Sequence, residues 1–233
     1  MKAIRITGSL SLGAALILAC TDRIGPTRFT GMNAATAGGQ ASQTSAVVDA
    51  VGDVKKNTPA WLDIASASIT HKTGQFVFDV ELAAPIPSDP ALDPLVPKQI
   101  DHLGIAYALD TDSTTAPVGY PFGQNSRNPF EFFFGVFWNP TGSFGMGTGF
   151  VGLLFDRRPL LTGGQATITA IPISIQGNRV SVVLDAGALG GPATFAWAAF
   201  TELDMHVHPP DEWCCEDIVP DVSNKVPLAT WPQ

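Results

Sequence analysis

Carboxylates on short polar segments are the side chains of this chain most suited to chemistry. The segment Asp110-Thr111-Asp112-Ser113-Thr114 carries an oxygen on every side chain and follows an apolar, strand-like run. Alternate oxygen-bearing side chains on a loop can converge on a calcium ion, which takes about six to eight oxygen ligands. The same composition suits a solvated turn, in which Asp and Ser side chains bond to their own backbone. Both interpretations stay open at the level of the sequence.

A second group of potential ligands lies in residues 204–233. His206 and His208 would face the same way on an extended segment, and the adjacent Cys214 and Cys215 follow closely. Zinc prefers imidazole and thiolate, but this spacing matches no established zinc site. Neighbouring cysteines also cannot close an unstrained disulfide. We interpret residues 204–233 as an irregular polar tail and expect no obligatory metal in it.

Aromatic side chains next to predicted loops are candidates for stacking against a sugar ring. Tyr120 and Trp138 are the two that qualify, whereas Trp197 lies within an apolar run and is assigned to the core. The glycines of Gly147-x-Gly149-x-x-Gly152 match a dinucleotide-binding fingerprint in letters only. That motif needs a helix after it, but Leu153-Leu154-Phe155 predicts a strand. We therefore exclude a nucleotide site there.

No spacing in the chain nominates a catalytic residue. The sequence contains no G-x-S-x-G elbow, no HExxH helix and no Walker loop. Carboxylates such as Asp63, Asp101 and Glu131 leave a hydrolase open as the alternative. Glycoside hydrolysis needs two acids at a defined separation, which a sequence cannot show.

Strands are the elements that must position these residues. Phe76, Phe78, Val80 and Leu82 alternate with more polar residues, which predicts a strand with one buried face. Similar patterns, separated by turn residues, occur at 62–70, 103–109, 130–138, 148–155, 166–175, 179–184 and 193–203. No window shows the spacing of an amphipathic helix. The sequence predicts an all-β domain over 49–203, a two-sheet antiparallel sandwich.

The charge balance restricts the partners. Of 233 residues, 21 are acidic and 13 are Lys or Arg, which gives a formal net charge of −8. A surface that follows a phosphate backbone needs the opposite balance, so we exclude nucleic acid as a partner.

The N-terminal residues 1–19 have the pattern of a secretory signal. Lys2 and Arg5 precede an uncharged stretch that is too short to span a bilayer. Its end, Leu16-Ile17-Leu18-Ala19-Cys20, resembles the lipobox of bacterial lipoproteins. The resemblance implies a lipid on Cys20 and anchoring in the bacterial cell envelope, periplasmic or surface-exposed. An ordinary signal with an incidental cysteine is the alternative, and residues 20–48 predict a flexible tether.

Short motifs also resemble a group of bacterial secreted domains. They are Asp49-x-x-Gly52-Asp53, Trp61-Leu62-Asp63-Ile64, the 76–82 strand and Tyr107-x-Leu109-Asp110-Thr111-Asp112. Together they are similar to DOMON-like and family 9 carbohydrate-binding modules. The resemblance implies a jelly-roll sandwich, a sugar-binding face and loops stabilised by calcium. It makes Asp49, Asp53, Asp110 and Asp112 candidate ligands of one shared calcium site.

These observations favour a binding protein over an enzyme. We expect a non-catalytic exported lipoprotein whose sandwich binds a glycan, a surface polymer or an envelope protein. A secreted hydrolase that uses carboxylates is the alternative.

Overall fold

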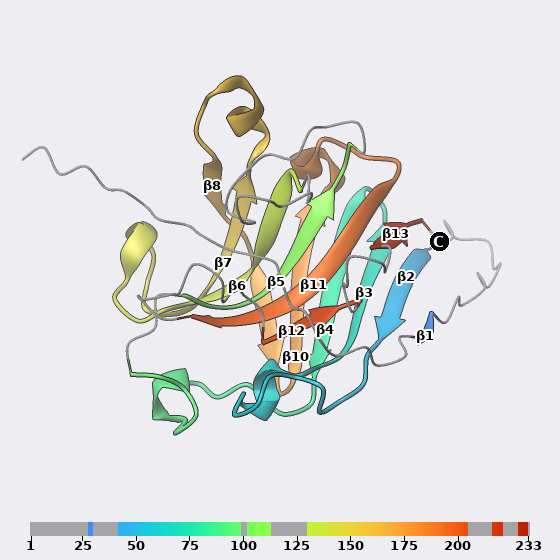
Figure 1. The fold of residues 1–233 in the computed structure, drawn as a ribbon. Coiled ribbons are helices and arrows are strands. Elements are labelled where there is room, and N and C mark those ends of the chain that lie inside the picture. The colour runs from blue at the N-terminus through green and yellow to red at the C-terminus, as the bar shows by residue number, and fades with distance from the viewer. Residues whose placement is uncertain are drawn as a thin grey trace, which may run out of the picture.

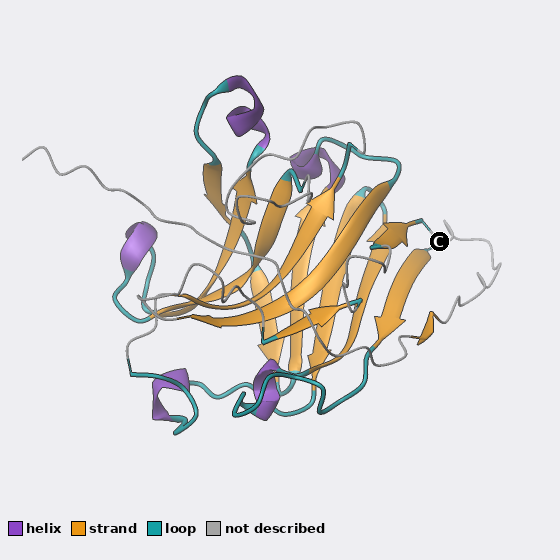
Figure 2. Cartoon of the chain, viewed as in Figure 1, coloured by secondary structure: helices purple, strands orange, loops and turns teal. Residues whose placement is uncertain are grey.

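Two antiparallel β-sheets packed face to face form the protein. The computed structural model describes residues 28–29, 42–98, 102–112, 130–204, 216–220 and 228–232. Figure 1 shows the two layers and Figure 2 shows that helix is confined to short turns between strands. The predicted antiparallel β-sandwich is confirmed.

The first sheet has six strands in the order β1-β2-β3-β4-β10-β9. These strands are β1 (Arg28–Phe29), β2 (Gln43–Val48), β3 (Ile64–Lys72), β4 (Gln75–Leu82), β10 (Arg179–Asp185) and β9 (Ile173–Gln176). The hairpin of β3 and β4 turns through Thr73 and Gly74, both with positive φ. Every pair in this sheet is antiparallel.

The second sheet has seven strands in the order β12-β11-β5-β6-β7-β8, with β13 also pairing β11. These strands are β12 (Asp217–Val219), β11 (Phe195–Asp204), β5 (His102–Asp110), β6 (Phe132–Asn139), β7 (Gly149–Asp156), β8 (Thr167–Ala170) and β13 (Ala229–Trp231). All pairs are antiparallel here as well.

Five 3-10 turns lie among the described segments. They are η1 (Ala60–Leu62), η2 (Pro90–Leu92), η3 (Ser143–Gly145), η4 (Arg158–Thr162) and η5 (Ala186–Leu189). Within the described segments no helix has the length and apolar character needed to cross a membrane.

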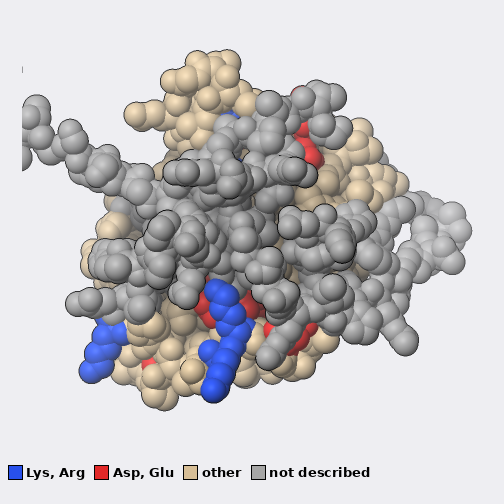
Figure 3. All heavy atoms as spheres, viewed as in Figure 1, with Lys and Arg blue, Asp and Glu red and all other residues tan. Residues whose placement is uncertain are grey.

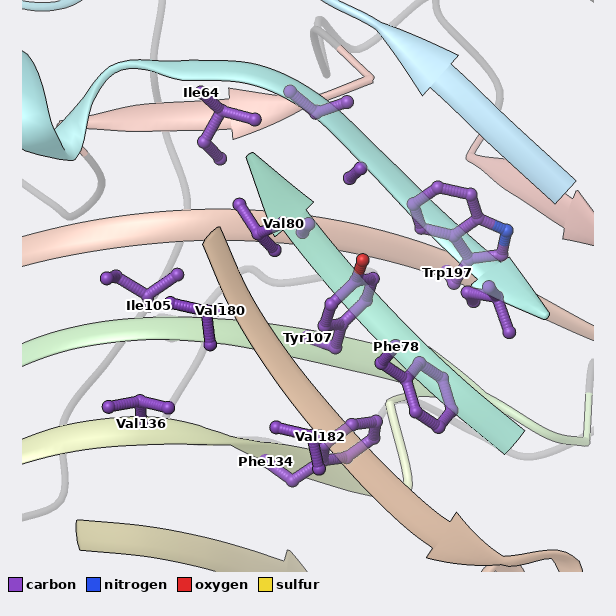
Figure 4. Packing of buried hydrophobic residues seen from close by; sticks show 14 of the residues in the cluster. Ile64, Phe78, Val80, Ile105, Tyr107, Phe134, Val136, Val180, Val182 and Trp197 are labelled. Carbon is purple, nitrogen blue, oxygen red and sulfur yellow. The ribbon is translucent and has the colours of Figure 1, made fainter. Parts of the chain in front are cut away.

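The main core lies between the sheets, and β4 contributes to it by strict alternation. On β4, Phe76, Phe78, Val80 and Leu82 are each no more than 2% exposed, as their spacing predicts. Figure 4 shows how side chains from both layers interlock, with Tyr107 of the second sheet directed at the first. Its hydroxyl donates to the carbonyl oxygens of Ser68 (3.1 Å) and Asp79 (2.6 Å). This buried hydroxyl is therefore satisfied by the facing sheet.

The predicted strand at 166–175 is two strands in different sheets. β8 pairs with β7, whereas β9 pairs with β10, and Ile171-Pro172 joins them. Pro172 has no N–H to donate to a ladder, so pairing stops there. Gly152 makes room for the connection, because a Cβ at that position would lie 2.3 Å from the carbonyl oxygen of Ile171. Gly152, the last of the three glycines that matched the nucleotide fingerprint, is thus a packing residue within a strand.

The predicted flexible tether over residues 20–48 includes residues that form strands, so its predicted C-terminal boundary is too far along the chain. Both β1 and β2 lie inside it, and β2 pairs with β3 along its full length. Only two side chains of β2 are buried, Ser45 and Val47. Ser45 accepts a hydrogen bond from Trp197 Nε1 (3.1 Å) and donates to the carbonyl oxygen of Thr230 (3.0 Å). A strand whose core position is a serine looks like a polar linker in sequence.

The interpretation of residues 204–233 as an irregular tail is wrong for the described part. β12 pairs with β11 at Ala199–Thr201, and β13 pairs with β11 at Phe195–Trp197. Trp231 of β13 is 3% exposed and stacks on Phe195 with 6.1 Å between the ring centroids. These three-residue strands are too short for alternation to be visible, and they form because β11 offers them a free edge.

Candidate cation site

Three carboxylates from distant parts of the chain converge at one end of the sandwich. Asp49, Asp53 and Asp217 each place a carboxylate oxygen within 4.8 Å of the other two. Asp49 follows β2, Asp53 lies four residues further along that loop, and Asp217 opens β12. The cluster therefore joins the first sheet, its connecting loop and the C-terminal edge of the second sheet.

Backbone hydrogen bonds hold the loop of residues 49–63 in place. The Asp49 N–H donates to the carbonyl oxygen of Ala65 (3.0 Å), which extends the β2–β3 ladder by one residue. The Gly52 N–H donates to Asp63 Oδ2 (2.8 Å), so the loop bends back onto the start of β3. Gly52 has a φ of 96°, a conformation that glycine adopts without strain. This is the physical reason for glycine in the Asp-x-x-Gly-Asp motif.

Asp63 adds a fourth carboxylate beside this group. The residue is 3% exposed, and its Oδ1 atom is buried without a hydrogen-bond partner among the described residues. Both carboxylate oxygens of Asp53 are buried as well; burial raises the pKa of this carboxyl group, and its own backbone N–H partly opposes the rise. Buried carboxylate oxygens without donors are costly, because each has lost its hydration.

Asp217 is positioned by the strand that the sequence did not reveal. It lies opposite Thr201 on β11 and is 7% exposed. Its Oδ2 accepts a hydrogen bond from the Ile64 N–H (2.6 Å) and its Oδ1 from the Ile218 N–H (2.8 Å). The neighbouring Glu216 reinforces the contact, since Thr58 Oγ1 donates to its Oε2 (2.5 Å). Asp217 thus couples β12 to the start of β3.

Burial raises the pKa values of three carboxyl groups in and beside the cluster. Burial, with smaller contributions from the charges of Asp53 and Asp63, raises the pKa of Asp217 to about 7. Burial also raises the pKa of Asp53 and of Asp63 above their ordinary values. The backbone N–H of Lys55 donates to the carbonyl oxygen of Glu216 (3.4 Å), which ties the loop to the residue before Asp217. Figure 3 shows basic and acidic side chains side by side along the lower margin of this face.

An all-oxygen cluster of this kind has one clear chemical use. Carboxylate oxygens are hard ligands that suit calcium or magnesium, whereas zinc and copper favour imidazole or thiolate. A divalent cation among these acids would replace mutual repulsion by coordination and supply the partner that Asp63 Oδ1 lacks.

A second group of charged residues lies on the outer face of the seven-stranded sheet. Burial first, and the charge of Glu131 second, raise the pKa of Asp110 to about 6. Glu131 is 2% exposed, and its Oε2 accepts hydrogen bonds from the N–H (2.7 Å) and the hydroxyl (3.1 Å) of Thr111. Arg157 adjoins them and donates from Nη1 to the carbonyl oxygen of Phe130 (2.9 Å), while burial lowers its pKa to about 10.

The two acidic groups do not meet, so the predicted shared site is wrong. Asp110 lies opposite Ala196 on β11 and Asp217 lies opposite Thr201, five residues along the same strand. That separation is about 17 Å at ~3.4 Å per residue. Asp49 and Asp53 therefore belong to one group and Asp110 to another, and Asp112 is an exposed residue beside Asp110. In the structure, the carboxylates close to Asp49 and Asp53 are those of Asp63 and Asp217, and not those of Asp110 and Asp112.

The remaining predicted site residues divide into two sets. Trp138 is partly buried at the margin of the core, with its ring 5.1 Å from that of Phe150, and its role in stacking on a sugar stays a prediction. Cys20, Tyr120, Asp101, His206, His208, Cys214 and Cys215 lie outside the described residues. Sequence reasoning missed Asp217 as a ligand because its only signal is an acid before two apolar residues in an otherwise polar segment.

No family model matches this chain, and no curated protein matches it.

Proposed function

We propose that this protein is a calcium-binding, non-catalytic β-sandwich module carried on a lipid anchor in the bacterial cell envelope. The observation that supports it is the convergence of Asp49, Asp53 and Asp217 within 4.8 Å, next to the buried Oδ1 of Asp63. The lipobox-like segment ending at Cys20 supports the anchor. The ligand of the module would be a glycan, a surface polymer or an envelope protein.

Calcium fits the cluster better than magnesium does. Calcium accepts irregular sets of carboxylate and carbonyl oxygens, whereas magnesium demands near-octahedral geometry and keeps several waters. The three carboxylates here come from two distant chain segments with no common symmetry. An exported protein also meets calcium at concentrations that suit a site of modest affinity.

Thermal unfolding in calcium and in chelator tests the proposal. Binding to the folded state at a hundredfold excess over Kd stabilises it by about 2.7 kcal/mol, which corresponds to a rise in Tm of about 5–10 °C. Wild type should show this rise between EDTA and millimolar calcium, and Asp217→Asn should lose most of it. Magnesium at the same concentration should have a smaller effect.

Asp112→Asn is the matched control, because it removes one carboxylate that lies away from the cluster. This variant should keep the full response to calcium. Equal Tm values for wild type in EDTA and in calcium would rule out the cation site.

A carboxylate hydrolase is the second candidate, and one observation favours it. Asp110 and Glu131 adjoin each other, and the pKa of Asp110 is raised to about 6, as in acid–base pairs. However, Glu131 is 2% exposed and its Oε2 is occupied by Thr111. That environment suits the fixing of a turn better than contact with a substrate.

A further inference from the structure

One margin of the seven-stranded sheet ends in an uncovered strand. All four residues of β8 are exposed, and within the described residues β8 pairs only with β7. Figure 1 shows β8 at the edge of the molecule opposite to the β12 side. An edge strand presents a row of backbone donors and acceptors to any strand that approaches it.

This edge lacks the charged residues that normally protect such strands. Residues 159–178 contain no Asp, Glu, Lys or Arg, although the chain as a whole has a formal net charge of −8. In Figure 3 the lobe at the top, where Figure 1 places β8 and the turn before it, is almost entirely uncharged. Leu161 and Ile168 add exposed apolar side chains, at 46% and 36%.

We propose that β8 is a homodimer interface, at which it pairs antiparallel with β8 of a second copy of this chain about a two-fold axis through Ile168. Such pairing extends the sheet across both copies and satisfies the free backbone groups of both edges at once. It is isologous, so each residue contact occurs twice and the assembly closes at two copies.

The ladder with β7 fixes which register keeps the two faces of the sheet continuous. Ile168 lies opposite Phe155 and Thr169 opposite Leu154, so Ile168 lies on the outer face and Thr169 on the inner face. Residues directly opposite each other across strands share a face. With Ile168 on the axis, it meets Ile168 of the second copy, and Thr167 meets Thr169. Both are favourable cross-strand pairs.

The lack of charge along this edge, and its sequence, favour a second copy as the occupant. Two chains of net charge −8 repel each other over most of their surface, and an approach along residues 159–178 brings no like charges together. The sequence Thr167-Ile168-Thr169 is also the same read in either direction, so an antiparallel copy reproduces its own pattern.

Engineered disulfides test this register directly. In the full chain with Cys20, Cys214 and Cys215 all changed to Ala, Ile168→Cys should form a disulfide-linked dimer on mild oxidation. Val183→Cys is the matched control. Val183 is 38% exposed, but it lies on β10, which has a neighbouring strand on each side in the other sheet and so offers no free edge. We expect at least about tenfold more dimer from position 168, where Cβ atoms would lie ~5 Å apart.

Two further measurements complete the test. Thr167→Cys and Thr169→Cys should crosslink when the two proteins are mixed and not when each is oxidised alone. In sedimentation velocity, the wild-type chain should show concentration-dependent association. The Ile168→Lys variant should lose this association, and the Val183→Lys variant should keep it. Crosslinking at position 168 no greater than at 183, or a wild-type chain that stays monomeric at all concentrations, would overturn the proposal. Neither result bears on calcium binding, which has its own readout.

Discussion

Carboxylates dominate the chemistry of this protein at the scale of single residues. Asp63, Glu131 and Asp217 are each no more than 7% exposed, although acids seldom lie in protein interiors. Backbone N–H groups hold part of each carboxylate, from Gly52, Thr111 and Ile64 respectively. Their positions fix loops and strand ends. At the proposed cation site their negative charges also repel one another, and a divalent ion would offset that repulsion.

The group at Asp110 makes stability depend on pH in a defined direction. Its pKa rises from 3.8 to about 6 in the folded protein, so the folded state binds more protons than the unfolded state in that interval. Stability from this group is therefore highest below about pH 4, falls as the pH rises through about 6, and is constant beyond. Asp110→Asn should be more stable than wild type at pH 7 and equal to it near pH 4.

The expected gain at pH 7 is about 1 kcal/mol, after a discount for the partial exposure of Asp110. Urea unfolding midpoints in EDTA at both pH values measure it, and Asp112→Asn serves as the control for the loss of one charge. A difference between Asp110→Asn and wild type that does not change with pH would contradict this account.

At the scale of elements, alternation predicted the central strands well. Positions 76–82 and 103–109 form β4 and β5, because each has one face in the core and one face outside it. The predictions failed where burial depends on partners far away in sequence. β2 shows one buried serine satisfied by Trp197 and Thr230, and β12 has three residues. The proposed cation site could be predicted only in part for the same reason. The sequence indicated Asp49 and Asp53, but Asp217 lies near Asp49 only because β12 pairs with β11.

The closing strand β13 should matter to stability although it has only three residues. Trp231 is 3% exposed and meets Phe76 edge to face at 5.6 Å. Trp231→Ala should lower the free energy of unfolding by about 3–5 kcal/mol, a large part of the ~5–15 kcal/mol typical of a domain. Val183→Ala, at a surface position, should change it by less than about 0.5 kcal/mol. Chemical denaturation of the three proteins measures both; equal midpoints for Trp231→Ala and wild type would show that β13 is not part of the cooperative fold.

At the scale of the whole molecule, the sandwich is closed by its own chain ends. β2 enters next to β13, and the Ser45 hydroxyl donates to Thr230 in the last strand. The proposed cation site also brings an early segment of the chain, at Asp49, together with a late one, at Asp217. Among the described strands, this arrangement leaves β8 as one free edge available for association. Residues 1–41 precede β2 and carry the proposed anchor.

The anchor gives the last prediction. Cys20→Ala should abolish incorporation of labelled palmitate and move the protein from the membrane fraction to the soluble fraction of a bacterial host. The physical reason is that each buried CH₂ of an acyl chain contributes about 0.8 kcal/mol, so two or more chains hold a protein firmly, and the substitution removes their attachment point. Cys214→Ala, which removes a thiol elsewhere, should leave both the label and the membrane fraction unchanged. If Cys20→Ala stayed with the membrane and the wild-type chain took up no palmitate, the chain would instead carry an ordinary signal with an incidental cysteine.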